Sequence, residues 1–251
     1  MLNSFDVTWI VILGVFLLAG IVKGVVGMGL PTVAMGLLAI TMPPPDAAAI
    51  LLVPSFATNV WQLLAGPSFF GLCKRLWTMM VGIVIGTVSG AGLIAGAHST
   101  GALAALGVAL TLYAALGLRS KKFVVRPTHE PWLSPLIGVV TGLITGATGV
   151  FVIPAVPYLQ ALQLERNDLI QALGLSFTVS TVALAGGLFG QGVFEASTSL
   201  LGLSLLALVP ALLGMFAGQH LRERMSVETF RRVFFIGLLL LGLYLTFKGL
   251  S

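Results

Sequence analysis

Residues 20–31 read GIVKGVVGMGLP, residues 142–154 read GLITGATGVFVIP, and each stretch lies inside a long apolar run. At an offset of 122 residues, three glycines of the first stretch and an aspartate after it coincide with the same residue types in the second half. The aligned residues are Gly20, Gly24, Gly27 and Asp46 with Gly142, Gly146, Gly149 and Asp168. Apolar segments that are interrupted at corresponding places in two halves of a chain are typical of the substrate site of a membrane transporter.

The composition of the chain indicates a protein built for lipid. Of its 251 residues 57% are hydrophobic and 8% are charged, and the mean hydropathy is +1.07. Soluble globular domains carry about 25% charged residues. Residues 1–20 lack a basic region and contain Asp6, so we expect a retained helix and not a cleaved signal. Because Cys73 is the one cysteine, the sequence predicts no internal disulfide, no metal cluster and no cofactor.

Two of the eight apolar segments are longer than one membrane crossing requires, which is about 20 residues. These two, 7–41 and 132–163, contain the glycine stretches. The other segments are approximately 47–65, 76–97, 101–118, 168–190, 198–219 and 231–249.

The basic residues decide how these segments are threaded, because cytoplasmic loops are enriched in Lys and Arg. Eleven of the thirteen Lys and Arg fall in four loops. If every segment crossed once, the halves would run parallel and five of these charges would lie on the wrong face. If each long segment breaks and returns as a hairpin, the halves are inverted and all eleven lie on one side, with Lys248 outside. The sequence therefore predicts an all-α polytopic membrane protein of two inverted repeats, each a broken helix–loop–helix segment plus three transmembrane helices.

The predicted boundaries follow from this threading. The first inverted repeat spans residues 1–118, a cytoplasmic linker spans 119–131, and the second inverted repeat spans 132–251. Both termini are then outside. The loop charges also account for the pI of 9.8, so we expect a lipid bilayer and a small anion as partners, and no nucleic acid.

The glycine stretches predict irregular backbone at membrane depth, which is tolerated only where protein buries it or where it lines a watery cavity. We expect turns at residues 24–29 and 146–149, followed by short helices that begin near Met28 and Val150. Helix N-termini carry free N–H groups and partial positive charge, and they bind anions. Two such ends that meet from opposite sides would form a small oxyanion site at the midplane.

Polar residues at helical spacing follow each stretch. Ser55, Thr58, Asn59 and Gln62 form one stripe, and Ser176, Ser180 and Thr181 form another. Such residues line a pathway, bond between helices, or bond to their own helix backbone. Lys23, whose counterpart is Thr145, is the one charge predicted inside an apolar segment, where it either serves function or extends to an interface. The predicted substrate-binding residues are Lys23, Gly27, Gly29, Ser55, Thr58, Asn59, Thr145, Thr148, Gly149, Ser176, Ser180 and Thr181.

The remaining ionisable residues restrict the mechanism. We expect Asp46 and Asp168 to cap the helices that they precede. No Asp or Glu is predicted at the centre of a crossing, and His98, His129 and His220 fall at segment ends, so the sequence gives little support to a proton relay. An anion that leaves an interior-negative compartment gains about 2.3 kcal/mol per charge and 100 mV. We therefore predict facilitated anion export driven by membrane potential, with sodium coupling left open.

The paired G-x-x-x-G-x-x-G motifs, the prolines and aspartates after them, the Gly-rich third helix and the basic linker resemble the sulfite exporter TauE/SafE family of bacterial membrane proteins. The resemblance covers nearly the whole chain. It implies that the chain exports sulfur-containing anions such as sulfite, sulfonates or sulfoacetate across the bacterial inner membrane, from a site between the halves. The resemblance does not determine which anion is carried. It also leaves the oligomeric state open, a homo-oligomer included. Val25, Val26 and Met28 depart from the small residues that family members often carry there.

Three alternatives come from other classes of protein. The sequence at residues 174–177, GLSF, is similar to the setting of a serine nucleophile, but the candidate base His220 lies at a segment end, so we expect no enzyme. An ion channel usually needs an oligomeric pore or rings of charge, and the chain clearly shows neither. A transporter of another small anion, or of a neutral or cationic solute, is the third alternative.

Overall fold

The computed structural model describes residues 4–96, 100–119, 124–196, 199–224 and 226–251. His98, Lys121 and Lys122, which the sequence predictions include, lie outside these ranges. Within them the regular structure is helical throughout, as predicted. The helices are α1 (Ser4–Val26), α2 (Leu30–Leu38), α3 (Pro44–Leu64), α4 (Phe69–Gly96), α5 (Thr100–Leu118), α6 (Glu130–Thr148), α7 (Ala155–Ala161), α8 (Arg166–Gly190), α9 (Val193–Ala196), α10 (Ser199–Arg224) and α11 (Val227–Leu250).

Eight helices of the described chain are long and apolar enough to cross a membrane: α1, α3, α4, α5, α6, α8, α10 and α11. Their outer surfaces carry large apolar side chains that water would not favour. Phe70, Leu240 and Phe247, for example, are 84%, 64% and 80% exposed. Exposed apolar surface on this scale marks contact with lipid, so the chain is a multi-pass membrane protein.

The two predicted helix breaks are present. In the first half, α1 ends at Val26 and α2 begins at Leu30; in the second half, α6 ends at Thr148 and α7 begins at Ala155. The short helices thus begin later than the sequence analysis expected, at Leu30 instead of Met28 and at Ala155 instead of Val150.

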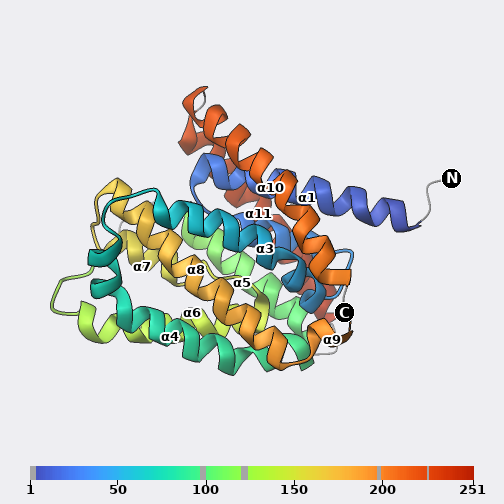
Figure 1. Ribbon diagram of the computed structural model, residues 1–251, viewed down its shortest axis with the longest axis horizontal. Helices are drawn as coiled ribbons and strands as arrows, with labels where there is room; N and C mark the ends of the chain where they lie inside the picture. Colours follow the sequence, from blue (N-terminus) through green and yellow to red (C-terminus); the bar gives the residue numbers. More distant parts are fainter. Residues whose placement is uncertain (1–3, 97–99, 120–123, 197–198, 225) are drawn as a thin grey trace.

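The closest helix pairs join the two halves. Helix α4 packs along α6, α1 along α10, α5 along α11, and α3 along α8. If each helix is exchanged for its counterpart in the other half, the α1–α10 pair becomes the α6–α4 pair, and the α3–α8 and α5–α11 pairs map onto themselves. In Figure 1 the start of α1 and the end of α11 lie at the right, and the start of α6 lies at the left.

Glycines permit two of these pairs to approach closely. A Cβ atom on Gly24 would collide with the carbonyl oxygen of Met215 in α10, and one on Gly146 would collide with that of Thr87 in α4. Close backbone approach of this kind is the usual role of small residues in membrane helix pairs. Since Gly24 and Gly146 lie inside α1 and α6, the prediction that they belong to the turns is wrong.

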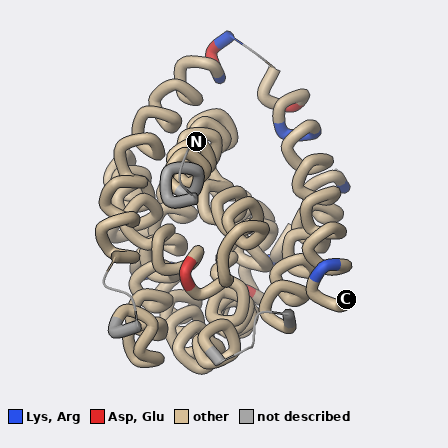
Figure 2. Tube along the Cα trace, turned by 90° about the vertical axis from the view of Figure 1, so that its right-hand side faces the viewer, with Lys and Arg blue, Asp and Glu red and all other residues tan. Residues whose placement is uncertain are grey.

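Charged residues lie mainly near helix ends. Figure 2 shows mostly uncharged chain, with Lys, Arg, Asp and Glu gathered at the outer tip that joins α10 to α11 and at a few other places. At the start of α4 and α6, the guanidinium of Arg75 donates to both carboxylate oxygens of Glu130, over 2.7 and 2.8 Å. Such pairs join helices at their ends, where water still reaches them.

Asp46 and Asp168, the two aspartates that align at the 122-residue offset, do not act as helix caps. The N-cap residues of α3 and α8 are Pro43 and Glu165, and neither helix has a side-chain cap hydrogen bond. Asp46 and Asp168 lie within the first turns, because α3 and α8 begin three and two residues before the predicted apolar segments. Their negative charge near the helix N-termini still interacts favourably with the helix dipoles.

Candidate functional site

The third glycine of each motif carries the break. Gly27 and Gly149 have φ angles of 82° and 71°, in the left-handed region that glycine adopts without cost. The last helical hydrogen bond before each break ends at corresponding residues: Gly27 N–H donates to the Lys23 carbonyl and Gly149 N–H to the Thr145 carbonyl, each over 2.7 Å. Lys23 and Thr145 therefore occupy equivalent places, one turn before the two breaks.

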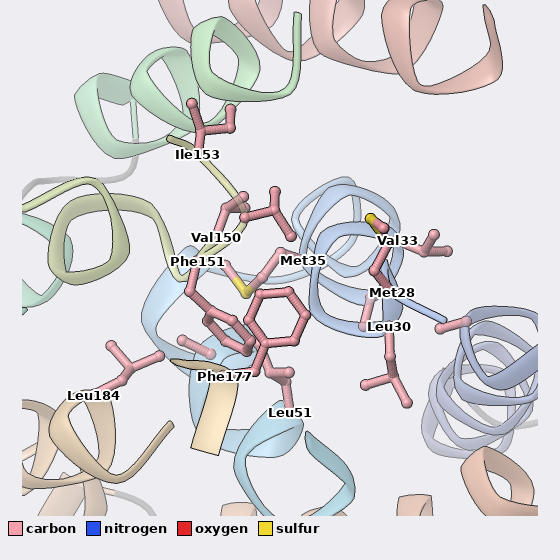
Figure 3. Close-up of a cluster of buried hydrophobic side chains, with 14 of the residues drawn as sticks. Met28, Leu30, Val33, Met35, Leu51, Val150, Phe151, Ile153, Phe177 and Leu184 are labelled. Carbon is pink, nitrogen blue, oxygen red and sulfur yellow. The ribbon is translucent and has the colours of Figure 1, made fainter. Parts of the chain in front are cut away.

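The two breaks are linked by apolar packing. A Cβ atom on Gly149 would lie 2.9 Å from the Cε and 3.0 Å from the Sδ of Met35, which comes from α2 in the other half. Phe151, in the second break, packs against Phe177 of α8 with ring centroids 5.4 Å apart. Figure 3 shows Met35, Phe151 and Phe177 grouped together. The centre between the breaks is thus filled by side chains.

Lys23 begins a chain of hydrogen bonds that crosses this centre. Its ammonium group donates to Asn59 Oδ1 in α3, and Asn59 Nδ2 donates to Thr181 Oγ1 in α8 over 3.3 Å. Lys23 is 3% exposed, Asn59 0% and Thr181 2%. The alternative in which Lys23 extends to an interface is therefore wrong, because the ammonium group is enclosed by protein.

Asn59 and Thr181 are counterparts, since they lie 122 residues apart, which is the offset of the glycine motifs. Their hydrogen bond therefore links a residue of the first half to the residue at the equivalent position of the second half. At the next pair of equivalent positions the halves differ, because Lys23 corresponds to Thr145. The site is therefore symmetric in backbone and asymmetric in charge.

Serine and threonine side chains in the polar stripes behave differently. The hydroxyls of Ser55, Ser176 and Ser180 are buried and have no hydrogen-bond partner within the described residues. The threonines instead donate to carbonyls of their own helices, at distances of 2.6 to 2.8 Å. These threonines are Thr58, Thr145, Thr148 and Thr181. The stripes thus contain three hydroxyls free to donate to a ligand and two, those of Thr58 and Thr181, that already bond the backbone; Thr145 and Thr148 lie outside the stripes, in α6.

Two glutamines fasten α3 to α8 at one end of their contact. Gln62 Nε2 donates to the Ile170 carbonyl over 2.9 Å. Gln171 Nε2 donates to the carbonyls of Leu63 and Gly66, each over 2.7 Å, and its Oε1 accepts from the Ser68 N–H. Gln171 thus holds the C-terminal end of α3, where backbone carbonyls lack helical partners.

The structure brings together some predicted site residues and separates others. Lys23, Asn59 and Thr181 form one connected group, and Ser55, Thr58, Ser176 and Ser180 lie buried on the same two helices. Gly29, at the start of α2, faces Phe234 and Val22 instead. Thr148 instead gives the backbone of the second break a hydrogen-bond acceptor, because its Oγ1 accepts from the Val150 N–H over 3.2 Å.

One buried hydroxyl close to a break was not predicted from the sequence. Thr32 lies in the first turn of α2, is 0% exposed and has no side-chain partner within the described chain. The signal for it was its place directly after Pro31, at the start of a helix whose N-terminal N–H groups need acceptors. A second helix N-terminus was expected near Val150. The structure has none there, because residues 150–153 are not helical and α7 begins at Ala155.

A cavity of about 320 Å³ lies apart from this group, between the starts of α4 and α6. Arg75, Trp77, Thr78, Pro127, Glu130, Pro131 and Ser134 line it. None of the predicted substrate-binding residues contributes to it. The polar group around Lys23 is thus closed to solvent in this conformation.

Two chemical alternatives find no support in the geometry. Among the described residues, no cluster of three His, Cys, Asp or Glu side chains could hold a metal ion. Ser176 is fully buried without a partner, whereas His220 is exposed and lies 3.9 Å from Glu223, so the two do not form a nucleophile–base pair.

Comparison with known protein families identifies the fold that carries this site. The model of the family "Sulfite exporter TauE/SafE" matches residues 12–245, nearly the whole chain. The chain belongs to the TauE/SafE family. It is therefore a membrane transporter. Searches of curated proteins and of solved structures found no match to this transporter.

Proposed function

We propose that this TauE/SafE transporter exports small sulfur-containing anions, such as sulfite or an organosulfonate, through the group around Lys23. The observation that carries the proposal is a buried lysine amine whose side-chain partner is the neutral amide of Asn59. A buried charge is costly unless an opposite charge accompanies it. An anion that binds beside Lys23 supplies that charge, and the free hydroxyls of Ser55, Ser176 and Ser180 supply further donors.

The proposed threading is a pair of inverted repeats in a bacterial inner membrane. Two features support it. The helix pairs map onto one another when each helix is replaced by its counterpart in the other half, and the start of α1 and the end of α11 lie on the side opposite the start of α6. In this arrangement the loops that contain Arg75, Arg126 and Arg166 face the cytoplasm, in agreement with the positive-inside rule. Oligomeric assembly is not required for the site, whose residues all come from one chain.

The proposed transport cycle alternates access around the contact between α3 and α8. In the present conformation Lys23 is enclosed, and Gln62 and Gln171 close the end of that contact on the side of the basic loops. Release of these glutamine hydrogen bonds would admit an anion from the cytoplasm, and separation of the opposite end would discharge it. The membrane potential favours export by about 2.3 kcal/mol per charge and 100 mV.

The experiment is sulfite efflux from proteoliposomes under an imposed voltage, with Lys23→Ala and Lys248→Ala compared. Lys248 is the control because it is exposed and donates to a backbone carbonyl at a helix end. Removing one partner of a buried ion pair costs about 3–5 kcal/mol, so Lys23→Ala should weaken apparent affinity by about two to four powers of ten. The proposal fails if Lys23→Ala leaves affinity unchanged, or if flux ignores voltage and follows a proton or sodium gradient.

A further inference from the structure

Among the side chains that the structure describes, which leave out those of residues 4–8, 195 and 196, Lys23 is the one charged group that is buried. The other Lys, Arg, Asp and Glu side chains of that set are half-buried or exposed. In the middle of the protein, a bound ligand would therefore meet at most one full positive charge, that of Lys23 in its protonated form, and no negative one.

The hydrogen bonds from Lys23 lead to α3 and α8, whose buried polar side chains add donors without adding charge. The side-chain oxygen of Asn59 is occupied by Lys23, and its amide nitrogen is engaged with Thr181. The free groups on the same two helices are the hydroxyls of Ser55, Ser176 and Ser180. An ammonium has three N–H donors, so Lys23 keeps two after its bond to Asn59. The group thus offers several hydrogen-bond donors to an oxyanion and a single unit of charge.

We infer that this site, given the proposed function, accepts oxyanions with one negative charge and rejects those with two. A monoanion neutralises Lys23, so the occupied site carries no net charge at membrane depth. A dianion leaves one charge without a buried partner, and burial of an uncompensated charge is strongly unfavourable. The N-terminus of α2 supplies at most about half an elementary charge and does not replace a second cation.

The same reasoning excludes a zwitterion. A sulfonate that also carries an ammonium group would place a second cation near Lys23, and none of the side chains with a described burial is a buried carboxylate that could receive it. The preferred ligand is therefore hydrogensulfite or a simple alkyl sulfonate. Sulfoacetate, with two negative charges, and taurine, with one charge of each sign, should be poor substrates.

The test compares substrates that share a sulfonate or sulfate group and differ in charge. Flux of methanesulfonate, sulfoacetate, sulfate and taurine is measured in the same proteoliposomes, at zero imposed voltage so that the driving force does not depend on charge. We expect kcat/KM for methanesulfonate to exceed that for each of the others by about 100-fold or more, which corresponds to about 2.8 kcal/mol. Comparable rates for sulfoacetate or sulfate would overturn the inference and leave the proposed function standing. If a correctly folded protein carries none of the sulfur anions, sulfite included, both fail.

A second cation supplies an independent test. Thr145 is the counterpart of Lys23, so Thr145→Lys places the added charge at the equivalent position of the other half. Purified Thr145→Lys protein that elutes as the wild type does should gain at least about tenfold in sulfate affinity relative to methanesulfonate, measured by ligand-induced thermal shift. An unchanged ratio in folded protein would contradict the charge argument. If the variant does not fold, the wild-type substrate series decides.

Discussion

Substitution of the two break glycines by alanine tests whether the breaks of the two halves meet. Gly27 and Gly149 share a left-handed backbone, in which alanine costs about 1–2 kcal/mol. Their surroundings differ. A Cβ atom on Gly27 meets nothing within 4 Å, whereas a Cβ atom on Gly149 meets Met35 at 2.9 Å. Overpacking of this kind adds about 1–3 kcal/mol, so we expect Gly149→Ala to cost about 2–5 kcal/mol and Gly27→Ala about 1–2 kcal/mol.

The assay is thermal unfolding in detergent, supported by sulfite flux. For a chain of this size, 1 kcal/mol shifts Tm by about 2–4 °C. Gly27→Ala should therefore lower Tm by about 2–8 °C, and Gly149→Ala by more. Both variants should still insert into the membrane, because neither change alters the apolar segments.

A double-mutant cycle with Met35→Ala separates backbone strain from steric overlap. Removal of the Met35 side chain should recover about 1–3 kcal/mol of the cost of Gly149→Ala, because the overlapping atoms are gone. The same change should leave the cost of Gly27→Ala unaltered within about 0.5 kcal/mol. Equal coupling at both glycines, or none at Gly149, would show that Met35 does not press on the second break.

Three further predictions concern packing and the polar stripes. Gly24→Ala should lower Tm because the new Cβ collides with α10, whereas Gly14→Ala in the same helix has open space and should stabilise the helix by about 0.5–1 kcal/mol; equal Tm values would contradict the close approach. Gln171→Leu removes three hydrogen bonds and should speed the reaction of a cysteine placed at Leu63 with a thiol reagent, in a background that lacks Cys73; an unchanged rate would mean that this end is held by other contacts. Replacement of three polar residues of α3 by alanine should reduce transport by at least about tenfold more than replacement of three residues on the outer face of α3, at similar expression. Equal losses of transport in the two triple variants would argue that the polar residues do not line the pathway. The first set is Ser55, Thr58 and Asn59, and the second is Val53, Phe56 and Val60.

The local features of the fold were predictable from the sequence because they depend on short-range periodicity. The apolar runs predict membrane-crossing helices, and the structure has eight that are long enough. The glycine motifs predict breaks, and α1 and α6 end at Val26 and Thr148, directly before Gly27 and Gly149. The spacing of Ser55, Thr58 and Asn59 predicts one helix face, and all three are buried.

The identity of each partner was decided by the tertiary structure, because partners lie far apart in the chain. Lys23 and Asn59 are 36 positions apart, and Asn59 and Thr181 are 122 apart. No periodicity indicates that Asn59 joins them. The same holds for the motif glycines: Gly24 and Gly27 are three residues apart, yet one packs against α10 and the other turns the chain. Helical spacing determines which residues share a face, and the packing of the two halves determines what that face meets.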